Sequence, residues 1–83
     1  MIRIEVIGLE PPCQKCNELL ENARQAAKDA GIEAEVVKLW TLSADVRHKY
    51  GLLLSPALAI EGLVVAQGKV YKRERIVGLL QGF

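Results

Sequence analysis

Hydrophobic and polar residues alternate at the start of the chain. Isoleucine or valine occupies positions 2, 4 and 6, whereas positions 3 and 5 carry charged side chains. Alternation with a period of two is typical of a β-strand. Gly8 interrupts the pattern, and we therefore predict a first strand that ends there.

A helical pattern follows the prolines at positions 11 and 12. From Cys13 onward, apolar residues recur at intervals of three and four, namely Cys16, Leu19, Leu20, Ala23, Ala26, Ala27 and Ala30. This spacing is typical of a helix that buries one face. Gly31 ends the pattern, because a residue without a Cβ readily takes the left-handed conformation that terminates a helix. We predict a long helix that starts at Cys13 and packs against the sheet.

A second strand is predicted over residues 33–40, which alternate at first and end in an apolar run. A helix of this length between two strands is what a parallel pair requires, so the three elements should form a βαβ unit. Ser43 can cap a short helix that runs through about Lys49.

The last part of the chain predicts a hairpin and a closing helix. Two apolar runs, 57–60 and 63–66, flank the dipeptide Glu61-Gly62, which favours a tight antiparallel turn. Residues 72–81 form an amphipathic helical pattern with Ile76, Val77, Leu79 and Leu80 on its apolar face. The predicted order is β-α-β-α-β-β-α, an α/β fold with a four-stranded mixed sheet and helices on its faces.

Composition and charge narrow the class of protein. A chain of 83 residues with 51% hydrophobic and 25% charged residues is typical of one globular domain, residues 1–83. The net charge is +1 with both signs interleaved, which argues against nucleic-acid binding. The first residues lack the apolar core of a secretory signal, and no apolar run approaches the ~20 residues that span a bilayer. We expect a cytoplasmic monomer that does not bind membranes.

Both cysteines lie together at the start of the long helix. Cys13 and Cys16 are separated by two residues, which lets the two thiols meet within one helical turn. The first turn of a helix favours the thiolate, the form that attacks disulfides and binds metals. A disulfide that closes so short a loop adds little stability, and a reducing compartment favours catalytic or metal-binding cysteines over structural ones. The motif therefore indicates redox chemistry first and a metal site second.

Other interpretations of the cysteine pair stay open at this point. A soft-metal module or metallochaperone for Cu(I) or Zn would use the same two thiols, although zinc would need further ligands from a dimer or a partner. Two buried cysteines can also simply pack as small hydrophobes. A non-enzymatic adaptor that only binds through its groove is a third class.

A second motif lies about forty residues after the first. Tyr50-Gly51 is followed by three leucines, and then Ser55-Pro56 opens an apolar run. Together with Cys13-Gln14-Lys15-Cys16, this stretch resembles the small archaeal and bacterial thioredoxin-like or glutaredoxin-like proteins of the redox-active disulfide type. The resemblance covers nearly the whole chain and implies the thioredoxin fold.

The resemblance implies an enzyme that exchanges thiols and disulfides and transfers electrons. Cys13 is expected to attack a disulfide in a protein or a small molecule, and Cys16 to resolve the mixed disulfide. The partners are then a disulfide-containing protein and a reductase or thiol donor that the sequence does not identify. No cofactor and no metal are expected.

The resemblance also implies which residues shape the site. The peptide bond before Pro56 should be cis, which would lay the backbone of Ser55 beside the sulfurs. Pro12, Gln14 and Lys15 surround the cysteines in sequence. Lys15 is the nearest cation to the thiols, although an exposed helix residue without influence on them is the simpler interpretation.

Five other residues with acidic, aromatic or imidazole side chains are assigned no catalytic role. Glu5 and Glu10 do not have the spacing of the acid that thioredoxins bury in the strand before the cysteines. Trp40 is predicted to be buried in the core or at an edge of the sheet. His48 is predicted at the surface, and Tyr50 is expected to pack beneath the proline turn.

Overall fold

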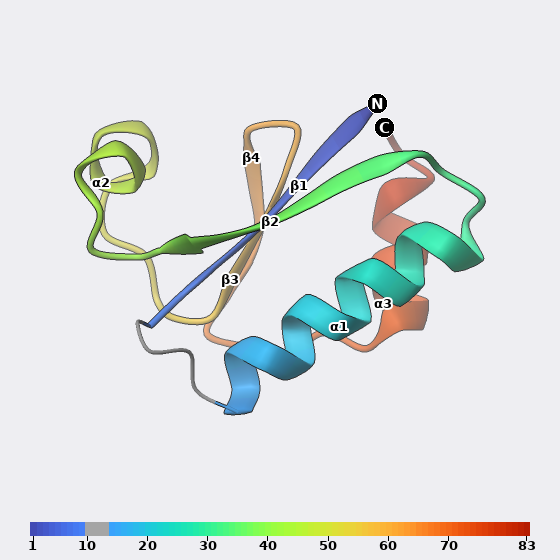
Figure 1. Ribbon diagram of the computed structural model, residues 1–83, viewed down its shortest axis with the longest axis horizontal. Coiled ribbons are helices and arrows are strands. Elements are labelled where there is room, and N and C mark those ends of the chain that lie inside the picture. The colour runs from blue at the N-terminus through green and yellow to red at the C-terminus, as the bar shows by residue number, and fades with distance from the viewer. Residues whose placement is uncertain (10–13) are drawn as a thin grey trace.

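The computed structural model describes residues 1–9 and 14–83, which form a four-stranded sheet and three helices (Figure 1). The elements are β1 (Ile2–Gly8), α1 (Gln14–Asp29), β2 (Ala34–Trp40), α2 (Ala44–Tyr50), β3 (Ala57–Ile60), β4 (Leu63–Gln67) and α3 (Arg73–Leu80). This is the predicted order, with bounds close to the predicted ones. Ser43 caps α2 as predicted, because its Oγ accepts a hydrogen bond from the Val46 N–H at 3.2 Å.

The strand order in the sheet is β2-β1-β3-β4. The predicted parallel pair is confirmed, since β1 and β2 run in the same direction with Gly8 opposite Trp40. Strand β3 pairs antiparallel with both β1 and β4. The carboxyl ends of β1 and β2 and the amino end of β3 therefore meet at one end of the sheet, which we call the β1 carboxyl end.

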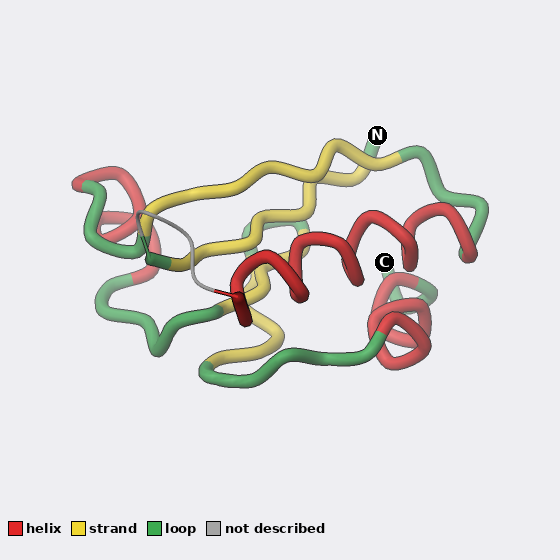
Figure 2. The backbone as a smooth tube through the Cα atoms, turned by 60° about the horizontal axis from the view of Figure 1, so that its bottom comes forward, coloured by secondary structure: helices red, strands yellow, loops and turns green. Residues whose placement is uncertain are grey.

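Helices α1 and α3 lie on the same face of the sheet (Figures 1 and 2). The predicted apolar face of α1 is buried at Cys16, Leu19, Ala23, Ala26 and Ala27. Of these side chains, Leu19 and the three alanines join Ile4 and Val6 of β1 and Ile76 and Leu80 of α3 in the larger hydrophobic core. Packing of α1 on β1 holds the first turn of α1 at the β1 carboxyl end.

Helix α2 covers part of the opposite face of the sheet. Its Val46 packs in a smaller cluster with Ile7 of β1 and with Ala57 and Ala59 of β3. Glu5 lies on this same face, since strand residues two apart share a face. It is 4% exposed despite its charge, because β1 has a strand on each side and a helix layer near each face.

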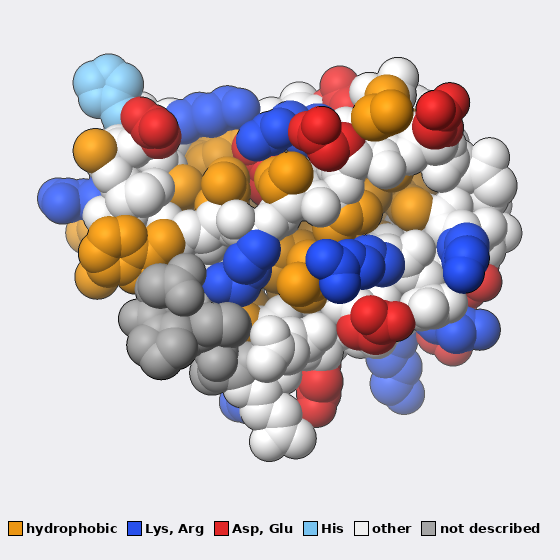
Figure 3. Space-filling view, viewed as in Figure 1, with side chains coloured by type: hydrophobic (Ala, Val, Ile, Leu, Met, Phe, Trp, Pro, Cys, Tyr) orange, Lys and Arg blue, Asp and Glu red, His pale blue; other side chains and the backbone are white. Residues whose placement is uncertain are grey.

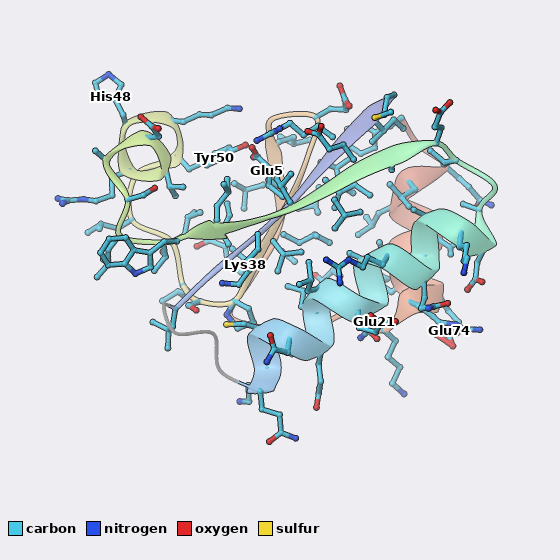
Figure 4. All side chains as sticks on the ribbon, in the orientation of Figure 1. Glu5, Glu21, Lys38, His48, Tyr50 and Glu74 are labelled. Atoms are coloured by element: carbon cyan, nitrogen blue, oxygen red, sulfur yellow. The ribbon has the colours of Figure 1, made fainter. Side chains whose placement is uncertain are left out.

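Two side chains stabilise the buried carboxylate. The Tyr50 hydroxyl donates a hydrogen bond to Oε1 of Glu5, and Nε of Arg3 lies 3.0 Å from Oε2 (Figure 4). Burial alone would raise the pKa of Glu5, but the hydrogen bonds from Tyr50 and Arg3, together with the positive charges of Lys49 and Arg3, outweigh it and hold that pKa below its usual value. Burial and the bond to Glu5 raise the pKa of Tyr50 to about 12. The last residue of α2 is thus tied to the middle of the sheet.

We expect Tyr50→Phe to lower the free energy of unfolding at pH 7 by about 2 kcal/mol, because a hydrogen bond to a buried carboxylate is lost. A carboxyl whose pKa is depressed in the folded state stabilises the fold above its unfolded pKa, and this contribution disappears as pH falls through the folded value. The difference between wild type and variant should therefore shrink below about pH 4.

Urea unfolding at pH 7 and pH 3 measures this difference. Tyr71→Phe is the matched control, because the described residues provide no hydrogen-bond partner for the Tyr71 hydroxyl. Equal losses in the two variants, or a Tyr50 effect that does not change with pH, would contradict the role given to Glu5.

Candidate functional site

The sulfur of Cys16 sits in a closed niche at the β1 carboxyl end. Cys16 is the third residue of α1 and its side chain is fully buried. Gly8, the last residue of β1, lies directly beneath it. A Cβ added at Gly8 would lie 2.5 Å from the Cys16 sulfur. The backbone of Gly8 does not have a positive φ, so its conformation does not require glycine. Glycine is needed because any side chain at position 8 would overlap the sulfur.

The loop before β3 closes the niche from another side. The peptide bond between Ser55 and Pro56 is cis, and Pro56 is buried. The Ser55 Oγ lies 3.8 Å from the Cys16 sulfur, in a contact in which either atom can donate. Residues that are 39 positions apart in the sequence thus contact each other.

The end of β4 anchors this loop. The Gly68 N–H donates to the carbonyl oxygens of Leu54 at 3.2 Å and Pro56 at 2.9 Å. The Leu54 N–H donates to Oε1 of Gln67 at 3.1 Å. The Gly68 amide therefore anchors the residues on both sides of Ser55, which holds the backbone of Ser55 in place.

The structure brings together only part of the predicted site. Gln14 and Lys15 are exposed in the first turn of α1. Pro12 and Cys13, like Glu10, lie outside the described residues. The juxtaposition of the two cysteine sulfurs therefore stays a prediction of the sequence spacing, whereas Cys16, Ser55 and Gly8 are in contact.

Lys38 also lies near this end of the sheet, although no sequence motif marked it. Lys38 of β2 pairs with Val6 and so shares the face of the sheet that α1 covers. Its Nζ donates to the Leu9 carbonyl oxygen at 3.2 Å (Figure 4). A lysine within the otherwise apolar residues 36–40 was the sequence feature that could have drawn attention to this position. The contact with the Leu9 carbonyl oxygen places a cation at the β1 carboxyl end.

The predictions for the three aromatic or imidazole side chains have different outcomes. The prediction that Trp40 is buried is wrong, because the side chain is 42% exposed. Strand β2 is an edge strand, and the partner of Trp40 is Gly8, which has no side chain to cover the indole. His48 is exposed as predicted. Tyr50 packs in the cluster that contains Ala57, the residue after Pro56, and also binds Glu5.

Comparison with known proteins identifies the family. The family model described as a thioredoxin domain matches residues 2–81. The chain belongs to the thioredoxin family. It is 35% identical over 80 residues to a thioredoxin of Methanothermobacter thermautotrophicus, covering 96% of this chain and 99% of that protein. It is 29% identical over 83 residues to a thioredoxin of Methanocaldococcus jannaschii, covering 100% of this chain and 91% of that protein.

Membership of the thioredoxin family confirms the resemblance and the fold class drawn from the sequence. The family is one of thiol-disulfide oxidoreductases. Across the part of this thioredoxin-family chain that the structure describes, no helix combines the length and apolar content needed to cross a membrane. The same residues, which exclude Cys13, contain no cluster of three or more His, Cys, Asp or Glu side chains suited to hold a metal ion.

We expect Gly8→Ala to lower the free energy of unfolding by about 2 kcal/mol, because the new Cβ forces the Cys16 sulfur or the strand to move. Urea unfolding under reducing conditions measures the change. Gly78→Ala is the matched control, since a Cβ placed there in α3 would meet no heavy atom within 4 Å apart from its chain neighbours and the backbone of its own helix, and alanine favours a helix. If Gly8→Ala has the same effect when Cys16 is replaced by alanine, the sulfur is not what excludes the side chain.

Proposed function

We propose that this protein reduces disulfides through a dithiol formed by Cys13 and Cys16. The observation that carries the proposal is the position of Cys16, which is buried in the first turn of α1 against Gly8 and Ser55. We expect Cys13, three residues earlier in the sequence, to lie at the exposed start of the helix. One thiol is then open to substrate and the other is protected.

The proposed reaction has two exchange steps. The Cys13 thiolate attacks one sulfur of the substrate disulfide, which breaks the substrate S–S bond and releases one substrate thiol. The Cys16 sulfur then attacks Cys13 in the mixed disulfide and releases the second substrate thiol. The substrate gains two electrons, and the protein holds a Cys13–Cys16 disulfide. A reductase or a thiol donor must return two electrons for the next cycle.

The surface around the site supports a protein as the substrate. Among the described residues, exposed apolar side chains follow β1, end or follow β2, or precede β3, and so lie toward the β1 carboxyl end. They are Leu9, Trp40, Leu42, Leu52 and Leu54. We call this set the apolar rim. Figure 3 shows hydrophobic side chains gathered where β2 leads into α2. Exposed apolar surface of this kind is typical of contacts with polypeptides, and an extended substrate segment could pair with the backbone of Ser55.

Reduction of insulin with dithiothreitol as the electron donor tests the proposed function. Wild type should accelerate the reaction, and Cys13→Ser should abolish the acceleration because the nucleophile is lost. Cys16→Ser should accumulate a mixed disulfide through Cys13, which mass spectrometry detects as a protein–substrate adduct. His48→Ala is the control variant, since His48 is exposed on α2, and its activity should match wild type.

Two results would overturn this proposal. The first is full activity in Cys13→Ser. The second is stoichiometric bound metal in the purified protein without reductase activity, which would favour a metal-binding module instead.

A further inference from the structure

The second exchange step requires a negative charge in a buried place. Cys16 must attack as the thiolate, yet its side chain is fully buried. Burial in apolar surroundings disfavours a charged sulfur unless a neighbouring group stabilises it. Apolar core residues, such as Leu19 of α1 and Val6 of β1, cannot do so.

Among the residues that the structure describes, the charged side chains near the niche bind other groups or are exposed. Glu5 lies on the opposite face of the sheet, bound to Tyr50 and Arg3. Lys15 and Glu18 of α1 are exposed. Lys38, on the α1 face of β2, donates to the Leu9 carbonyl oxygen. A described neighbour that does reach the sulfur is the hydroxyl of Ser55, at 3.8 Å.

A serine hydroxyl can form a hydrogen bond with a thiol in either protonation state. It carries one hydrogen to donate and two lone pairs that accept. It can therefore accept the S–H hydrogen of Cys16 in the resting dithiol, and after rotation it can donate its own hydrogen to the thiolate. The double anchoring of the loop by Gly68 keeps Ser55 in place for both arrangements.

We propose that Ser55 is a positioning residue that stabilises the Cys16 thiolate by hydrogen bonding and so accelerates resolution of the mixed disulfide. This inference rests on the proposed function. In the step, the Cys16 sulfur bonds to the Cys13 sulfur, and the bond between Cys13 and the substrate breaks. The substrate sulfur leaves with the electron pair of that bond and takes up the proton that Cys16 has lost, so that no further reactant is needed.

The first test titrates Cys16 alone, without any substrate. The chain contains two cysteines, so Cys13→Ala leaves Cys16 as the single thiol, and the ultraviolet absorbance of the thiolate reports its ionisation. Adding Ser55→Ala should move the titration midpoint up by about one pH unit, as expected when a hydrogen bond to a charged group is removed. Ser43→Ala is the control, because it removes the hydroxyl that caps α2 and should leave the midpoint unchanged.

A second pair of variants separates the hydroxyl from the shape of the side chain. Thr and Val have the same shape, so Ser55→Thr should keep the midpoint near that of the parent, whereas Ser55→Val should raise it as alanine does. This comparison also applies if Ser55→Ala does not fold. Equal midpoints for the threonine and valine variants would overturn the role of the hydroxyl.

The third test follows one turnover with both cysteines present. In Ser55→Ala, the mixed disulfide should form at the wild-type rate and decay about tenfold more slowly, because only the second step uses the Cys16 thiolate. Equal slowing of both steps, or no slowing, would overturn the inference. Failure of wild type to reduce insulin would instead reject the proposed function, and the titration of Cys16 would still decide whether Ser55 stabilises its thiolate.

Discussion

The close approach of the Cys16 sulfur to the backbone of Gly8 is the constraint on which the site depends. The first turn of α1 can approach β1 this closely only because position 8 has no side chain. Small residues farther along α1, Ala23, Ala26 and Ala27, continue the close packing of the helix on the sheet. The first turn of α1 is thereby fixed at the end of the central strand, beside the loop that carries Ser55 and Pro56.

The two faces of the sheet differ in what they bury and in which segment they position. The face under α1 and α3 contains the larger core and the niche for the Cys16 sulfur. On the face under α2, the buried carboxylate of Glu5 pairs with the half-exposed Arg3 and accepts a hydrogen bond from Tyr50 in the last turn of α2. Because the loop to Pro56 begins directly after α2, this contact positions the loop from one side of the sheet, while Gly68 anchors it from the other end.

Local patterns in the sequence were sufficient for the elements and their order. Periodicity predicted α1 and its buried face, Ser43 marked the start of α2, and Glu61-Gly62 marked a turn in which both residues have positive φ. These features depend on neighbours a few positions apart. Side-chain environments that depend on distant segments were not predictable in this way.

Glu5 and Trp40 show why burial was hard to predict from the sequence, since the charged residue is buried and the aromatic one is exposed. Glu5 is buried because its partner Tyr50 comes from a helix 45 positions away, and Trp40 is exposed because its neighbour across the sheet is a glycine. The contact between Cys16 and Ser55 was implied only by the family resemblance, not by periodicity. The pairing of Cys13 with Cys16 falls outside the described residues and stays a prediction.

Redox equilibration of the whole protein tests the central claim most directly. The protein is incubated with mixtures of oxidised and reduced dithiothreitol, and mass spectrometry measures the oxidised fraction. The account predicts one reversible transition in which each molecule loses two hydrogen atoms, with the two-electron slope of about 30 mV per tenfold change. A protein that stays reduced throughout, or that oxidises only by linking two chains, would contradict the account.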